Sequence, residues 1–284
     1  MGYDGAGIIA AVGDSVQGLK QGDEVYYSGS PIRQGSNASY QLVDGRSVAH
    51  KPRSLSMVES AAMPLTWITA YEALVERLGI SPGEEAGLLI INGAGGVGSV
   101  ATQIAKTLLR LPLVVTTASR PETVRFSKDM GATHVVNHRE DIVAQIADLR
   151  LDVPIKYCFI THGTTPYLDP VSRIVAPFGR VCSIVQTTDM SPMYGSQFMA
   201  KSLTFVWELL GTKPWFGTDV ESHGRMLRDL ARLLDEGKVR CHLKNTLRLD
   251  LKGLREGHEL VEGGKTIGKN ALSVDFGEGG EVFA

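Results

Sequence analysis

The sequence predicts an α/β protein built around a doubly wound parallel sheet, and three observations lead to that class. Short apolar segments alternate with amphipathic ones from residue 88 to about residue 207. The apolar segments are continuous, as in parallel strands that are buried on both faces. The first of them runs into a glycine-rich turn that opens directly into a helical pattern. In such a sheet, ligands bind at the carboxyl ends of the strands.

The glycine turn Gly93-Ala94-Gly95-Gly96-Val97-Gly98 follows the strand predicted over 88–92 and opens the helix predicted over 97–109. In a G-x-G-x-x-G turn the first glycine permits a tight turn, the second lets the backbone approach a pyrophosphate, and the third lets helix and strand pack closely. The helix start adds N–H groups and a partial positive charge. A purely conformational role for the glycines is the alternative. We expect a diphosphate to be held by Gly93, Gly95, Gly96, Val97 and Gly98.

The rest of the alternation extends the sheet beyond this first unit. Strands are predicted over 113–117, 134–136, 155–160, 180–185 and 202–207, and helices over 122–130, 141–149 and 167–175. Strands joined by intervening helices pair in parallel.

The segments on either side of the sheet have a different pattern. Residues 7–12, 25–27 and 38–43 are short strand-like stretches separated by turns, and 54–79 is helical, with Ser56 capping toward Glu59 and Pro64 as a break. After residue 207 we predict a loop over 211–218, a helix over 226–234, a strand over 245–249, a helix over 251–262, a strand over 271–276 and a frayed end over 277–284. The predicted domains are 1–65, 66–207 and a return segment, 208–284, that completes the first.

Composition excludes several classes of function. The 284 residues carry a formal net charge of -2 without a basic run, so neither nucleic acid nor a membrane surface is an expected partner. We find no signal or transmembrane segment. Three widely spaced cysteines, Cys158, Cys182 and Cys241, indicate thiols in a reducing compartment, and we expect the cytoplasm.

Several short motifs follow one another along nearly the whole chain: Gly2-Tyr3-Asp4-Gly5-Ala6-Gly7, Gly22-Asp23-Glu24-Val25, Ala62-Met63-Pro64-Leu65-Thr66, the glycine turn, Gly131-Ala132, Phe178-Gly179-Arg180 and Gly268-Lys269. In this order they resemble the medium-chain dehydrogenase/reductase superfamily. The similarity is to its zinc-free quinone oxidoreductase (zeta-crystallin-like) branch and to zinc-type alcohol dehydrogenase-like proteins. The resemblance implies a Rossmann sheet with a partial GroES-like β-barrel catalytic domain.

The first barrel strands of that family would precede Gly2 and do not occur in this sequence. A truncated gene product and a genuine shortened isoform are the two explanations. In either case we expect exposed strand edges and a compromised active site.

The residues after the second strand of the sheet predict the cofactor. An acidic residue about 20 positions beyond the glycine turn would hold the ribose of NAD. The sequence has Ala118-Ser119-Arg120 instead, and the nearest acid, Glu122, lies beyond Pro121. Serine and arginine suit a 2′-phosphate, so we expect NADP(H) bound by Ser119 and Arg120, with a solvated surface arginine as the alternative.

The resemblance adds two cofactor contacts, His138 on the adenosine side and Thr66 near the nicotinamide. A surface histidine and a helix cap are the respective alternatives. Zinc is not expected, because Tyr3-Asp4 and Pro64-Leu65-Thr66 stand where the family's zinc ligands would lie, and the chain has no C-x-x-C.

No catalytic residue can be assigned from the sequence. There is no nucleophile elbow, and Cys241-His242 is interpreted as a surface pair. Tyr40 and Tyr71 are interpreted as packing residues, and His162 as a loop residue more readily than an acid. Thr69 lies in the same region as Thr66. The aromatic residues Trp215 and Phe216 would line a substrate pocket or cover the hinge.

We therefore predict an NADPH-dependent, zinc-independent oxidoreductase that transfers hydride to a small-molecule substrate, a quinone or an α,β-unsaturated carbonyl. The alternative is a truncated, inactive homologue that binds NADP as a binding or regulatory protein. Methyl transfer from S-adenosylmethionine is disfavoured by the barrel-like flanks. The last strand, over 202–207, resembles a pairing edge and predicts a homodimer.

Overall fold

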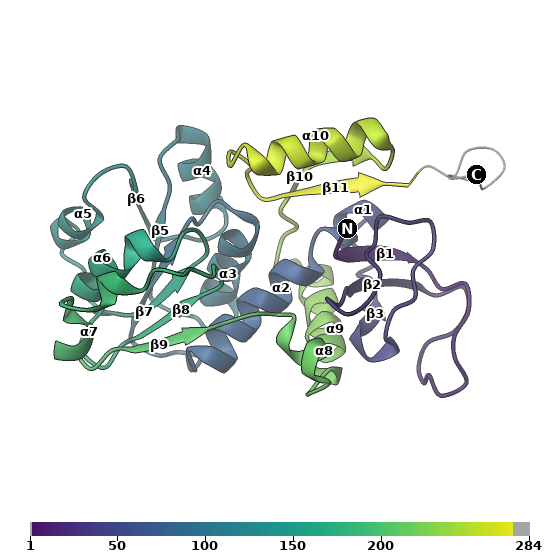
Figure 1. Cartoon of the computed structure of the whole chain (residues 1–284), viewed down its shortest axis with the longest axis horizontal. Helices are drawn as coiled ribbons and strands as arrows, with labels where there is room; N and C mark the ends of the chain where they lie inside the picture. Colours follow the sequence, from purple (N-terminus) through teal and green to yellow (C-terminus); the bar gives the residue numbers. More distant parts are fainter. Residues whose placement is uncertain (1, 275–284) are drawn as a thin grey trace. The chain divides into compact units, whose positions relative to one another are not determined.

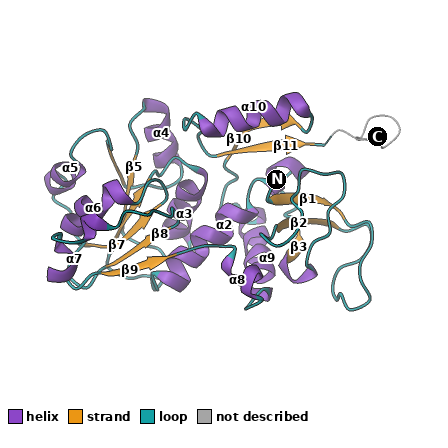
Figure 2. Ribbon diagram, in the orientation of Figure 1, coloured by secondary structure: helices purple, strands orange, loops and turns teal. Residues whose placement is uncertain are grey.

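The computed structural model describes residues 2–274 and divides the chain into two compact units (Figures 1 and 2). One unit contains the residues up to Ile68 together with those from Leu210 onward, and the other is Thr69–Leu209. The boundary falls inside helix α2 (Pro64–Tyr71). Each unit has its own sheet, and each is described separately below.

The unit Thr69–Leu209 contains a six-stranded sheet in which all neighbours are parallel. The strand order is β6-β5-β4-β7-β8-β9, which confirms the predicted doubly wound sheet. The strands are β4 (Gly87–Ile91), β5 (Leu113–Thr117), β6 (His134–Val136), β7 (Ile155–Ile160), β8 (Arg180–Ser183) and β9 (Thr204–Trp207). The winding direction reverses between β4 and β7, which is where such sheets bind ligands.

Helices cover both faces of this sheet, which explains why its central strands, such as β4, are apolar on both sides. Leu89 and Ile91 belong to a buried cluster with Ile142 and Val171, on the face of α5 and α6, whereas α3 contacts β4 and β5 and α4 contacts β6. The helices are α3 (Gly96–Thr107), α4 (Pro121–Asp129), α5 (Ile142–Asp148), α6 (Leu168–Ile174) and α7 (Gln197–Ala200), with short 3₁₀ turns η3 (Thr165–Tyr167) and η4 (Ser191–Met193) and a π-helix, η2 (Glu72–Arg77).

The other unit contains two small sheets. Strands β1 (Asp4–Ile8), β2 (Glu24–Ser28) and β3 (Val48–His50) form an antiparallel sheet, while β10 (Leu243–Arg248) and β11 (Lys269–Ser273) pair in parallel with each other. Its helices are α1 (Met57–Ala61), α8 (Thr212–Phe216), α9 (Glu221–Asp235) and α10 (Leu251–Glu262), with a 3₁₀ turn η1 (Gly45–Ser47). The Tyr26 hydroxyl of β2 donates to the Leu227 carbonyl of α9 at 2.5 Å, which fixes this helix on the sheet.

Local signals at the start of the helices are confirmed. Ser56 and Glu59 form a capping box: the Ser56 hydroxyl accepts from the Glu59 N–H, and the Glu59 carboxylate accepts from the Ser56 N–H at 2.9 Å. Pro64 separates α1 from α2 as the first residue of the second helix, a position that does not need its missing N–H.

Two expectations for the flanking segments are wrong. Residues 38–43 form no strand, because Gln41 ties them into a loop by accepting from the Tyr27 hydroxyl and donating to the Gln34 carbonyl at 2.7 Å. The expected loop over 211–218 contains the short helix α8. Within residues 2–274, β10 and β11 do not join the sheet of β1 to β3.

The last predicted strand extends to residue 276, whereas β11 ends at Ser273, and the expected frayed end over 277–284 lies outside the described residues. No helix in the described part of the chain is long and apolar enough to cross a membrane. The edge strand β9 pairs only with β8 within these residues, and the homodimer remains a prediction.

The third glycine of the turn generates a stability prediction. A Cβ on Gly98 would lie 2.2 Å from the carbonyl oxygen of Asn92. We expect Gly98→Ala to lower the free energy of unfolding by about 1–3 kcal/mol or more, because α3 would be forced away from β4. Urea denaturation measures this. The matched control is Gly13→Ala, whose Cβ would meet nothing within 4 Å, and equal effects of the two substitutions would contradict the assignment.

Candidate functional site

The glycine turn is fixed to the end of β5 by backbone hydrogen bonds. The Asn92 N–H donates to the Thr117 hydroxyl at 2.8 Å, and the Gly93 N–H donates to the Thr117 carbonyl at 3.2 Å. Asn92 has a φ of 66°, in the left-handed region, which reverses the chain at this point. A Cβ on Gly93 would lie 2.4 Å from that of Thr116, so the turn can approach β5 only with glycine here.

The start of α3 is open to a ligand. Gly95 is the N-cap residue of this helix, and no side chain caps it, whereas Asp141 caps α5 by accepting from two backbone N–H groups. Gly95, Gly96 and Val97 are partly exposed. The first N–H groups of a helix have no partner within the helix, and they bind anions readily. This geometry fits the diphosphate of a dinucleotide.

Ser119 and Arg120 lie next to this turn in the fold, directly after β5, and both are partly exposed. The Arg120 backbone N–H donates to the Thr123 hydroxyl at 3.1 Å, which fixes the residue at the start of α4. Its guanidinium Nε lies 3.2 Å from the Glu122 carboxylate. Glu122 lies in the first turn of α4, which confirms the prediction, and its pairing with Arg120 is a feature that the sequence alone did not indicate.

A cavity of about 320 Å³ lies where the loops after β6 and β7 meet, and it is lined by His138, Glu140, His162, Gly163 and Tyr167 among others. The pKa of His138 is lowered by burial, with further contributions from Arg139 and His162, so its imidazole is neutral at pH 7. The structure therefore brings together two histidines that sequence reasoning had treated separately.

In the unit of β1 to β3, Asp4 caps the start of α2. Its Oδ1 accepts from the Leu65 N–H at 3.0 Å, across 61 positions of sequence. Burial raises the pKa of Asp4 to about 7, although the charge of Lys269 and the Leu65 N–H act in the opposite direction. Asp4 and Lys269 had been noted only as parts of family motifs, and no local pattern could have shown that they approach each other.

The interpretation of Cys241-His242 as a surface pair is wrong, because the His242 side chain is fully buried. Its Nε2 lies 3.3 Å from the Thr66 hydroxyl, which donates to the Met63 carbonyl at 3.0 Å. Since the hydroxyl proton is used on Met63, the His242 Nε2–H donates to Thr66. Burial, followed by the charge of Lys269, lowers the pKa of His242 to about 3, so the ring is neutral.

The Thr66 side chain is 1% exposed. Its hydroxyl forms hydrogen bonds with the Met63 carbonyl and with His242, and it does not cap the helix. Its contact with the cofactor remains a prediction. Tyr40, interpreted as a packing residue, is 77% exposed, and that interpretation is wrong. Trp215 and Phe216 are also exposed.

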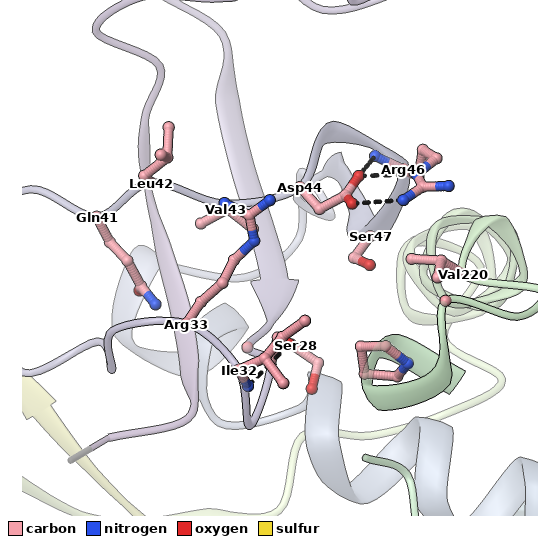
Figure 3. Close-up of a pocket in the computed structure, with 14 residues that line it drawn as sticks. Ser28, Ile32, Arg33, Gln41, Leu42, Val43, Asp44, Arg46, Ser47 and Val220 are labelled. Carbon is pink, nitrogen blue, oxygen red and sulfur yellow. Dashed lines mark hydrogen bonds and ion pairs between the residues drawn. The ribbon is translucent and has the colours of Figure 1, made fainter. Parts of the chain in front are cut away.

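A smaller cavity of about 190 Å³ lies in the same unit, between the end of β2, the following loop and the segment joining α8 to α9 (Figure 3). Arg33 extends into the space beside Val43 and Asp44. The Asp44 carboxylate accepts from Arg46 at 2.8 and 3.0 Å, and Arg46, with a smaller contribution from Arg33, lowers the pKa of Asp44. The lining combines apolar side chains with hydroxyl groups and with two guanidinium groups, those of Arg33 and Arg46, the second of which is paired with Asp44.

Among residues 2–274, the His, Cys, Asp and Glu side chains form no group of three or more that could hold a metal ion. Tyr3, Asp4 and Thr66, which the resemblance places at the family's zinc positions, carry neither a thiolate nor an imidazole, the ligands that zinc prefers.

The fold and the turn place the protein in the Rossmann-type α/β class. Residues 96–222 match the family described as zinc-binding dehydrogenase. A zinc-type alcohol dehydrogenase-like protein of Staphylococcus epidermidis is 38% identical over 96% of this chain and 82% of its own length. The crystal structure of a Rhizobium etli protein described as a candidate zinc-dependent alcohol dehydrogenase has a TM-score of 0.89 at 42% identity, covering 95% of this chain and 80% of that one.

An NADPH-dependent alkenal/one oxidoreductase of Arabidopsis thaliana chloroplasts is 30% identical over 84% of this chain and 54% of its own length. The chain belongs to the medium-chain dehydrogenase/reductase superfamily, together with the zinc-type alcohol dehydrogenase-like proteins. The resemblance found from the motifs is confirmed, and the family is one of oxidoreductases.

The Asp4 cap predicts a pH dependence of stability. Because the pKa of Asp4 is raised from 3.8 to about 7, the folded state holds the proton more tightly than the unfolded state. This stabilisation is fully present below about pH 4 and is lost as the pH rises through about 7. Asp4→Asn removes the titration, so we expect the Tm of the variant, relative to the unsubstituted protein, to increase from about pH 5 to pH 8. The control, Asp14→Asn at an exposed position, should leave the difference flat.

Proposed function

We propose that the protein is an NADPH-dependent, zinc-independent oxidoreductase that transfers hydride to a quinone or an α,β-unsaturated carbonyl. The observation that carries the proposal is the uncapped start of α3 beside Ser119 and Arg120 at the end of β5. The first group suits a diphosphate, and the second suits a 2′-phosphate. The name of the Arabidopsis relative supports both the cofactor and the substrate class.

The preference for NADP(H) follows from the charges after β5. NAD-binding sheets offer a carboxylate to the ribose diol at this point. Here the nearest carboxylate, Glu122, pairs with the Arg120 guanidinium at 3.2 Å. A 2′-phosphate carries more charge than a single carboxylate and matches the guanidinium fork, so it would take the place of Glu122. A charge-assisted hydrogen bond contributes about 1.5–3 kcal/mol, which corresponds to roughly ten- to one-hundred-and-fifty-fold in affinity.

The bound cofactor supplies the hydride, and the protein's contribution is to bind, orient and exclude water. The glycine turn would hold the diphosphate, Ser119 and Arg120 the 2′-phosphate, and the cavity at His138 the adenosine side. Because the His138 imidazole is neutral, Arg120 would provide the positive charge that binds the 2′-phosphate. Zinc independence rests on the donor set, since Tyr3 and the segment Pro64-Leu65-Thr66 stand at the positions of the family's ligands.

Consumption of NADPH, followed at 340 nm with a panel of quinones and enones, tests the proposed activity. We expect turnover with at least one member of the panel and lower kcat/KM with NADH. Saturable NADPH binding without turnover on any member would contradict the enzyme and support the alternative, a protein that binds NADP without catalysis.

Arg120 provides the sharpest test of the cofactor. We expect Arg120→Gln to weaken NADPH binding by about ten- to one-hundred-and-fifty-fold and to change NADH binding by less than about threefold, because only NADPH carries the 2′-phosphate. Calorimetric titration measures both. Arg125→Gln, at an exposed position of the same helix, is the matched control and should leave both affinities unchanged. An equal loss for the two cofactors would assign Arg120 to another role.

A further inference from the structure

Two glutamate side chains meet inside the unit of the parallel sheet, away from the glycine turn. Glu72, in the π-helix η2, is fully buried, and Glu208, the residue after β9, is 3% exposed. The Glu208 carboxyl lies close enough to that of Glu72 for the two to interact, and this interaction raises the pKa of Glu208. Two ionised carboxylates repel each other at such a separation, so a proton on one of the two groups favours the contact.

The π-helix η2 lets the guanidinium of Arg77 join the contact between Glu72 and Glu208. The Arg77 Nε donates to the Glu208 carboxylate at 2.9 Å, and its charge also acts on Glu72. In an α-helix, residues five apart point about 140° away from each other. The Leu78 N–H instead donates to the Ala73 carbonyl at 2.9 Å, five residues back, and this wider turn lets Glu72 and Arg77 approach Glu208 together.

The charges around the pair do not balance when both carboxyls are ionised. Arg77 is the cation in contact with Glu208, and it is shared with Glu76, whose carboxylate lies 3.8 Å from its Nη2. The neighbouring Cys182 of β8 is neutral, because burial raises the pKa of its thiol. Burial, followed by Glu72, raises the pKa of Glu208 to about 8. Near neutral pH the pair therefore retains one proton.

Glu208 is also fixed to the sheet, since its backbone N–H donates to the Ser183 carbonyl at the end of β8 at 3.0 Å. We propose that the proton shared by Glu72 and Glu208 is a latch, which holds the π-helix against the carboxyl ends of β8 and β9 and loosens as the pH rises. The latch involves none of the residues assigned to the cofactor and does not depend on the proposed activity.

The direction of the effect follows from the linkage of proton binding to opening. The closed state binds the proton with a pKa of about 8, and the opened, hydrated state with the ordinary value of 4.5. Opening is therefore least favourable below about pH 4.5, and its equilibrium constant rises by about tenfold per pH unit until it levels off near pH 8.

Hydrogen exchange of peptides that cover 72–80 and 204–209, corrected for the intrinsic exchange rates, tests the latch between pH 5.5 and 8.5. We expect the opening constant of the unsubstituted protein to rise by about tenfold per pH unit up to about pH 8. In Glu72→Gln the amide supplies a permanent N–H donor to Glu208 and removes the carboxylate that repels it, while burial still raises the pKa of Glu208. The pH dependence of opening should therefore weaken and move to lower pH.

Glu85→Gln, at an exposed position of the same unit, is the matched control and should retain the response of the unsubstituted protein. Glu208→Gln is the second variant, in which the amide donates to Glu72, and it should also weaken the response. A flat profile in the unsubstituted protein, which requires no variant to fold, would overturn the proposal. So would a Glu72→Gln profile that keeps the original slope.

Discussion

The close approach of β4, β5 and α3 at Asn92 is the constraint on which the candidate site depends. The Asn92 carbonyl oxygen occupies the space where a side chain on Gly98 would lie, and the Asn92 N–H is held by Thr117. This contact sets the point where α3 begins, and thus the direction of its first N–H groups. It also places the end of β5, with Ser119 and Arg120, beside the turn. In the proposed function, the position of the diphosphate and the preference for NADP(H) would therefore have one structural origin.

Much of this arrangement can be predicted from the sequence, because its signals are local. Most residues in the strands of the parallel sheet are apolar, and the segments predicted at 113–117, 134–136 and 155–160 coincide with β5, β6 and β7. The capping box at Ser56 lies within four residues of sequence. The strand predicted over 38–43 is wrong because its formation depends on contacts that are not local. Its alternating pattern is compatible with a strand, but a strand needs a neighbour to pair with, and the side chain of Gln41 provides a loop instead.

The contacts between polar groups inside both units could not be predicted from local sequence patterns. Asp4 approaches Leu65, His242 approaches Thr66, and Glu72 approaches Glu208, and each pair is separated by more than sixty positions in sequence. A glutamate in a helical pattern is ordinarily a solvated residue, and nothing near Glu72 in sequence indicates burial. Only the way the chain folds brings such groups together, so their shifted pKa values are properties of tertiary structure.

Asp4, which caps α2, titrates in a pH range that is unusual for an aspartic acid. A carboxyl with a pKa of about 7 is half protonated at neutral pH, unlike an ordinary aspartic acid, which is fully ionised there. The carboxyl at the start of α2 therefore exchanges its proton in the neutral range, so the charge at this helix start responds to changes of pH near 7. The buffering capacity of the protein near pH 7 includes a carboxyl group, in a range where histidines ordinarily account for the titration.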